Sequence, residues 1–167
     1  MTTYTSVVGI ITNIEYLGGM GNQSGDCAIL FTLEGENPAG AFQVQLPANA
    51  YVLNLHPFQI GDRATFFYDP NAPMVLIYPP RYTAVAGAYT PHGTTAMLDF
   101  FQNNFVNTDN SLMLNMAWNT PVTLANGQPF KGSLNNQLLL VLYGMTTRSI
   151  PAQTTPEQVV VFCQNQS

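Results

Sequence analysis

Charge is what this sequence has least of. Four Lys or Arg and nine Asp or Glu residues make only 8% of its 167 residues charged, where an ordinary soluble domain has roughly 25%. The hydrophobic fraction, 46%, is normal, so neutral polar residues replace the missing charges. Sixteen Asn, eleven Gln and seventeen Thr are present. We therefore expect a surface made mainly of amides, hydroxyls and backbone.

The shortage of positive charge excludes two classes of partner. Lys131 is the single lysine and the net charge is -5, whereas nucleic acids and anionic membrane surfaces both require a basic face. No apolar run approaches the ~20 residues of a membrane span, so we expect no membrane insertion. The first residues show neither the basic region nor the apolar region of a classical signal peptide.

Cysteine is scarce as well. Cys27 and Cys163 lie far apart and have no metal-ligand spacing. Two buried thiols are one interpretation, and a disulfide within or between chains is the other. Cys163 lies near the C-terminus, which favours an accessible position.

Helical periodicity is also absent, and strand patterns dominate. Apolar and polar residues alternate from Phe42 to Leu46, which places the apolar side chains on one face. In the first half we expect strands at residues 6–17, 27–34, 42–46, 51–53, 64–68, 74–78 and 82–86. In the second half we expect them at residues 96–101, 112–116, 122–124, 138–143 and 159–162. Residues 95–105 are the best helical candidate, and both strand and short helix remain open there.

This rhythm predicts an all-β fold, an antiparallel barrel or sandwich. Asn126-Gly127 is the strongest hairpin signal, because both residues tolerate positive φ. Each half has a strand ending in Tyr, a proline-rich crossing and a final strand, in the same order. We therefore expect a polar arm at residues 1–6 and two similar OB-like halves packed together, residues 7–89 and 90–167.

Two segments resemble a known group of proteins. One runs from Tyr68-Asp69-Pro70 to Tyr78-Pro79-Pro80-Arg81-Tyr82, and the other contains Ser149-Ile150-Pro151-Ala152-Gln153-Thr154. Together they resemble an uncharacterised β-rich family of Gram-positive spore-forming bacteria, which also occurs beside copper-amine-oxidase-like N-terminal modules. The resemblance covers residues 7 to 163 and implies an extracellular or spore-surface location, without any transferable catalytic residue.

No residue pattern indicates catalysis. His56 and His92 each neighbour a proline, so we expect both in turns. No Gly-x-Ser-x-Gly elbow is present. Residues 107–111 are only loosely like a calcium loop, because the closing bidentate acid is missing. We therefore predict a protein that is not an enzyme, with no catalytic residue, cofactor or metal.

Self-association is the function that these features favour. Natural β proteins protect their edge strands with lysine, other charges or proline, whereas strands such as residues 10–16 and 159–162 carry almost no charge. We predict a self-assembling structural protein that forms a fibre, appendage or coat layer on a bacterial spore surface through β-edge contacts. The assembly arm would include Thr2, Thr3, Tyr4 and Thr5, and Cys27 or Cys163 would form an intersubunit disulfide.

The alternative is a binding module at a cell surface. An OB-like barrel or β-sandwich would bind glycan or peptide there, with exposed aromatic rings stacking on the ligand. The candidate rings are those of Tyr78, Tyr82 and Trp118. Proline cannot donate to a β-ladder, so the prolines beside Tyr78 and Ile150 are expected to mark strand ends or edges.

Overall fold

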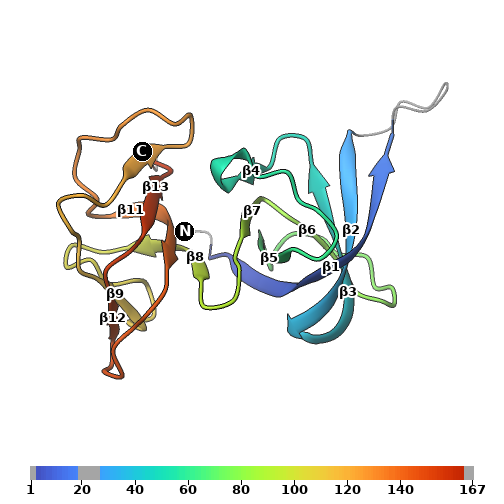
Figure 1. Ribbon diagram of the computed structural model, residues 1–167, viewed down its shortest axis with the longest axis horizontal. Coiled ribbons are helices and arrows are strands. Elements are labelled where there is room, and N and C mark those ends of the chain that lie inside the picture. The colour runs from blue at the N-terminus through green and yellow to red at the C-terminus, as the bar shows by residue number, and fades with distance from the viewer. Residues whose placement is uncertain (1–2, 19–26, 164–167) are drawn as a thin grey trace. The chain divides into compact units, whose positions relative to one another are not determined.

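The computed structural model describes residues 3–18 and 27–163. The chain divides into two compact units, residues 1–92 and 93–167, and each is built almost entirely of β-strands (Figure 1). The predicted all-β fold is therefore confirmed. The described residues form no closed barrel, and the several open sheets are consistent with a sandwich. None of the described helices has the length and apolar character needed to cross a membrane.

The first unit contains one seven-stranded sheet in the order β4-β7-β5-β1-β2-β3-β6. Its strands are β1 (Thr5–Leu17), β2 (Ala28–Asn37), β3 (Ala39–Pro47), β4 (Tyr51–Val52), β5 (Arg63–Tyr68), β6 (Arg81–Thr83) and β7 (Ala86–Tyr89). A 3-10 turn, η1 (Leu53–Leu55), follows β4. The boundary of this unit falls close to residue 89, where the sequence placed the end of the first half.

The alternating pattern of the first strands builds the core of this unit. Phe42, Val44 and Leu46 lie on one face of β3 and are buried, as the period of two requires. Phe31 and Phe66 stack on each other at 5.5 Å between ring centroids. Together with further Val, Leu and Ala side chains they form a continuous hydrophobic cluster.

Residues 81–89 contribute β6 to one end of this sheet and β7 near its other end. Strand β6 pairs with β3 in parallel and β7 pairs with β5 antiparallel. Between them, Ala84 N–H donates to Gln45 O at 2.9 Å and Val85 N–H donates to Phe67 O at 2.8 Å. The sheet therefore curls without a continuous ladder.

The second unit has shorter strands. A four-stranded sheet runs in the order β10-β13-β11-β8, and β12 pairs with β9. The strands are β8 (Thr95–Phe101), β9 (Leu112–Leu114), β10 (Val122–Leu124), β11 (Gln137–Tyr143), β12 (Ala152–Thr154) and β13 (Gln158–Val161). Phe101, Leu139, Val141, Val159 and Val161 are buried at its centre. Of residues 95–105, where helix and strand remained open, Thr95–Phe101 form strand β8.

The two units share one pattern of strand pairing. In the first, β7 pairs with β4 in parallel and with β5 antiparallel, β5 pairs with β1, and β3 pairs with β6 in parallel. In the second, β13 pairs in the same way with β10 and β11, β11 pairs with β8, and β9 pairs with β12. The strands also follow one another in the same order. This common topology supports an internal duplication.

Prolines stand where the sequence placed them. Pro79 and Pro80 immediately precede β6, and Pro151 immediately precedes β12. Both Tyr78-Pro79 and Ile150-Pro151 are cis peptide bonds. At Asn126-Gly127 the chain makes the predicted turn, with Gly127 at φ 86° and Leu124 N–H donating to Gln128 O at 2.8 Å.

Two expectations about strands were wrong. Residues 74–78 are not a strand, because no neighbouring strand pairs with them in the described part of the chain. Residues 159–161 were expected at an edge, but they lie between β10 and β11. Residues 13–17 do form an edge, because β1 pairs with β5 only as far as Ile10 and beyond that point pairs with β2 alone. In addition, β12 was not expected.

Candidate functional site

Residues 74–78 form the longest unbroken run of exposed large apolar side chains among the described residues. They are Met74, Val75, Leu76, Ile77 and Tyr78, in the connection from β5 to β6. Leu76 is 97% exposed and Tyr78 is 91% exposed, while Ile77 between them is 43% exposed. The side chains therefore alternate from Leu76 onward, as they do along an extended strand. We call residues 74–78 the apolar segment.

The backbone of the apolar segment is also largely unpaired. Ile77 N–H donates to Val75 O at 3.1 Å, and within the described chain no ladder joins the segment to a strand. Such a segment combines β-prone apolar side chains with free donors and acceptors, and it carries no charge. These are the properties of a segment that pairs readily with another chain.

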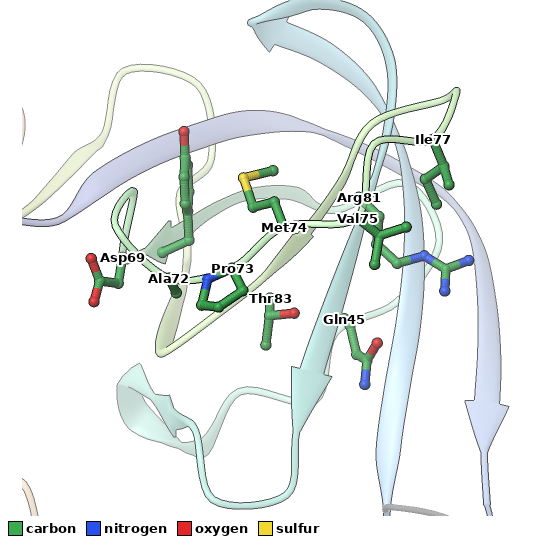
Figure 2. A pocket seen from close by; sticks show the side chains of 10 residues that line it. Gln45, Asp69, Ala72, Pro73, Met74, Val75, Ile77, Arg81 and Thr83 are labelled. Atoms are coloured by element: carbon green, nitrogen blue, oxygen red, sulfur yellow. The ribbon is translucent and has the colours of Figure 1, made fainter.

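One side of the apolar segment rests over a small pocket of about 180 Å³ (Figure 2). Gln45 of β3 and Thr83 of β6 line it, together with Met74 and Ile77 of the segment. Arg81 is held at the wall, where its Nε and Nη2 donate to Gln43 Oε1 at 3.3 and 3.1 Å. Met74 and Ile77 thus line the pocket, whereas Leu76 and Tyr78 are exposed to solvent.

A larger groove opens at another place in the same unit. Its volume is about 470 Å³, and its lining comes from the adjoining ends of β1, β2 and β3 and from residues 48–52. None of the described residues that line it is charged; they are Tyr16, Leu17, Gly18, Cys27, Ala28, Ile29, Leu46, Pro47, Ala48, Ala50 and Val52. We call this the uncharged groove. Ile29, Ala50 and Val52 also pack against the core, so the groove is an opening onto it.

The matching connection in the second unit differs in its hydrogen bonding. It also exposes large apolar side chains, Met145 and Ile150. However, Thr147 Oγ1 accepts from Gln153 N–H at 2.9 Å, and Thr154 Oγ1 donates to Met145 O at 2.7 Å. This connection is therefore tied to its own unit, whereas the apolar segment is not.

Both cysteines are free and exposed. Because both thiols are exposed, the interpretation as two buried thiols was wrong, and the described residues contain no disulfide. Cys27 lies beside β2 and lines the uncharged groove. Cys163 follows β13. Each thiol is thus accessible to another molecule.

The N-terminal arm is shorter than expected. Thr5 and Ser6 are the first residues of β1, where they pair with Tyr68 and Phe67 of β5. They were expected to be free because their hydroxyl side chains give no apolar signal. Thr3 and Tyr4 precede the strand, and Thr2 lies outside the described residues.

The three candidate ligand aromatics are distributed over the two units. Trp118 is 97% exposed and belongs to the second unit, whereas Tyr78 belongs to the first. Tyr82 was wrongly expected to be exposed. It packs against Phe42 and lies 4.7 Å from Tyr68 between ring centroids. Burial, with Tyr68 nearby, raises the pKa of Tyr82.

Other polar clusters have structural partners. His56 Nε2 lies 2.9 Å from Asp62 Oδ2, and its ring stacks on Tyr89 at 4.4 Å. Asn107 is buried in the loop that loosely resembled a calcium site. Its side-chain Nδ2 donates to Asp109 Oδ1 and Ser111 Oγ, both at 2.9 Å. An amide N–H thus occupies the centre of this loop, and the described residues contain no group of three metal-ligating side chains.

Comparison of this chain with protein-family models, curated proteins and solved structures gave no match. The fold and the surface of the molecule itself therefore carry the functional argument.

The sequence drew attention to residues 74–78 but assigned them the wrong role. An apolar run has the same sequence pattern whether it forms a paired strand or stays exposed. The flanking Pro73 and Pro79 were the available signal that it stands apart from the sheet. The uncharged groove had no sequence signal, because its residues come from separate strands.

Proposed function

We propose that this protein is a non-enzymatic, self-assembling structural protein that forms a fibre, appendage or coat layer. The observation that supports the proposal is the exposed, uncharged and unpaired apolar segment. Soluble monomers rarely expose contiguous apolar surface of this kind without a partner. A second copy of the same chain is the partner that is always present.

The energetics favour association through this segment. Fully burying a side chain such as Leu or Val contributes about 1.5–3 kcal/mol relative to exposure. Leu76, Tyr78 and Val75 are all largely exposed, and main-chain hydrogen bonds would add to their burial. Few charges oppose close approach, because only 8% of the residues are charged.

The edge contacts first expected are a weaker basis for assembly. In the first unit the edge strands β4 and β6 have only two and three residues. Residues 13–17 of β1 form a further edge, which carries Glu15. In the second unit the edge strand β8 is longer and carries Asp99, a charge that protects an edge. We therefore assign the main contact to the apolar segment.

Leu76→Asp tests this proposal. The change adds a charge at a position exposed to solvent, so we expect the folded unit to keep its stability within about 0.5 kcal/mol. We expect the wild-type chain to form extended assemblies in negative-stain microscopy and sedimentation velocity, and the variant to remain monomeric.

Ile150→Asp is the matched control. It makes the same kind of change at a 91% exposed residue in the corresponding connection of the second unit. We expect this variant to assemble like the wild type. A wild-type chain that stays a monodisperse monomer across pH and salt, in oxidising buffer, would contradict the proposed function.

The location of the assembly is part of the proposal. The resemblance to proteins of spore-forming bacteria supports an extracellular or spore-surface setting. Cys27 and Cys163 are both exposed, so oxidation outside the cell would link neighbouring copies through intersubunit disulfides. A ladder on a non-reducing gel that collapses on reduction is the expected result.

A second function, binding glycan or peptide at a cell surface, is favoured by Trp118 alone. Its ring is 97% exposed, and an exposed ring of this kind can stack on a sugar face. Because it is the only tryptophan, its fluorescence reports directly on binding. Unchanged emission across a glycan series would count against this second function.

A further inference from the structure

We propose that the uncharged groove of one copy receives the apolar segment of a second copy, so that the chain polymerises head to tail. The occupant is residues 74–78, with Leu76 as the central side chain. This inference rests on the proposed function and names the surface on which that function would depend.

The two surfaces match in chemical character. Among the described residues the groove lining has no charged side chain, and the apolar segment has none either. An unpaired charge on either side would be desolvated at a high free-energy cost. Apolar side chains entering the groove would instead extend the core, because Ile29, Ala50 and Val52 already contact it. The groove volume of about 470 Å³ lies in the range of sites that enclose a few apolar groups.

The geometry of β3 separates the two surfaces on each copy. Gln45 lines the pocket under the apolar segment, whereas the next residue, Leu46, lines the groove. Successive residues of a strand point to opposite faces. The segment therefore cannot occupy the groove of its own chain while it rests on the Gln45 face.

This separation determines the type of assembly. The donor surface and the acceptor surface are different patches, so the contact is heterologous. Each copy that gives its segment still has an empty groove, and the next copy can fill it. The contact therefore produces open filaments or closed rings.

A mixing experiment with two complementary variants tests this arrangement. Leu76→Asp disables the donor and leaves the groove intact. Ala48→Trp fills the groove from an exposed lining position and leaves the donor intact. We expect each variant alone to sediment as a monomer. An equal mixture should form a species of twice the chain mass and nothing longer, because only one working contact remains.

The outcomes separate the inference from the proposed function. Ala48→Trp chains that polymerise like the wild type would overturn the groove assignment, while the proposed function would stand. A mixture that restores long polymers would overturn the one-donor, one-groove arrangement. A wild-type chain that does not assemble would overturn the proposed function itself.

A crosslink gives a second test that does not require filling the groove. Cys27 lies in the groove lining, so Leu76→Cys on a Cys163→Ser background brings two thiols together between copies. With oxidised glutathione as the oxidant, the two thiols lose two protons and two electrons and form one disulfide, and the glutathione is reduced.

We expect a ladder on a non-reducing gel and a linked peptide pair that contains positions 27 and 76. Ile150→Cys on the same background is the matched control, and we expect it to crosslink to Cys27 at least ten-fold less. Equal crosslinking by both variants, in chains that still sediment as assemblies, would overturn the groove assignment and leave the proposed function intact.

Discussion

At the scale of single residues, Asn107 organises the first part of the second unit. Its Nδ2 donates to Asp109 Oδ1 and Ser111 Oγ at 2.9 Å, and Asp99 Oδ2 lies 3.3 Å from the same nitrogen. Its Oδ1 accepts from the N–H groups of Ser111 and Leu112 at 2.9 and 2.8 Å. The buried Asn107 amide thus provides hydrogen-bond partners within a loop where the carboxylates of Asp99 and Asp109 would otherwise face each other.

Asn107→Asp should destabilise the protein by about 3 kcal/mol at neutral pH, because a buried donor becomes a carboxylate facing two others. Like charge and burial raise the pKa of such a group, so the loss of stability should shrink as the pH falls toward 4. Urea unfolding at both pH values measures this change.

Asn110→Asp is the control for that experiment. It adds the same charge in the same loop at an exposed position, and we expect less than about 1 kcal/mol of change. An equal loss in both variants would mean that net charge, and not the buried amide, accounts for the effect.

At the scale of elements, close backbone contact fixes the register of the long hairpin. Gly35 of β2 pairs with Gly9 of β1 and with Gly40 of β3. A Cβ on Gly35 would lie 2.6 Å from Gly40 O and 2.7 Å from the Phe42 ring, so no larger residue fits without moving the strands.

Gly35→Ala should lower the free energy of unfolding by at least about 1–3 kcal/mol, the usual cost of overpacking. Chemical unfolding followed by circular dichroism measures it. Gly144→Ala is the control, because its added Cβ would meet no atom closer than 3.5 Å. Comparable destabilisation by both changes would argue against the close contact as the cause.

At the scale of the whole molecule, low charge controls both solubility and association. The net charge is -5 at pH 7 and the isoelectric point is about 4.5. Lowering the pH from 7 toward 5 therefore removes most of the repulsion between copies.

The fold should survive this change. The hydrogen bond from Arg63 lowers the pKa of Glu36 below its ordinary value of 4.5. The stabilisation from that carboxylate is therefore complete above the ordinary pKa, and it is lost only as the pH falls through the lowered folded value.

We expect assembly of the wild-type chain to become faster between pH 7 and pH 5, as light scattering will show. Leu76→Asp should remain dispersed over the same range. Equal scattering from both chains would indicate non-specific precipitation near the isoelectric point.

The sequence predicted much of the strand pattern and part of the site. Alternation at residues 42–46 correctly placed a face of β3 in the core, and Asn126-Gly127 correctly placed a turn. The residue pattern did not show whether a given apolar segment finds a partner strand. For this reason residues 159–162 were expected at an edge but lie inside their sheet, and residues 74–78 were expected to pair but do not.

The scarcity of charge, the all-β fold and the repeated order of elements follow from the sequence by itself, because composition and period-two patterning are local properties. Only the tertiary structure decided which apolar residues stay exposed. It left residues 74–78 outside the sheet, and it brought the ends of β1, β2 and β3 together into an uncharged groove. Both results depend on contacts between residues far apart in the chain, which no local pattern specifies.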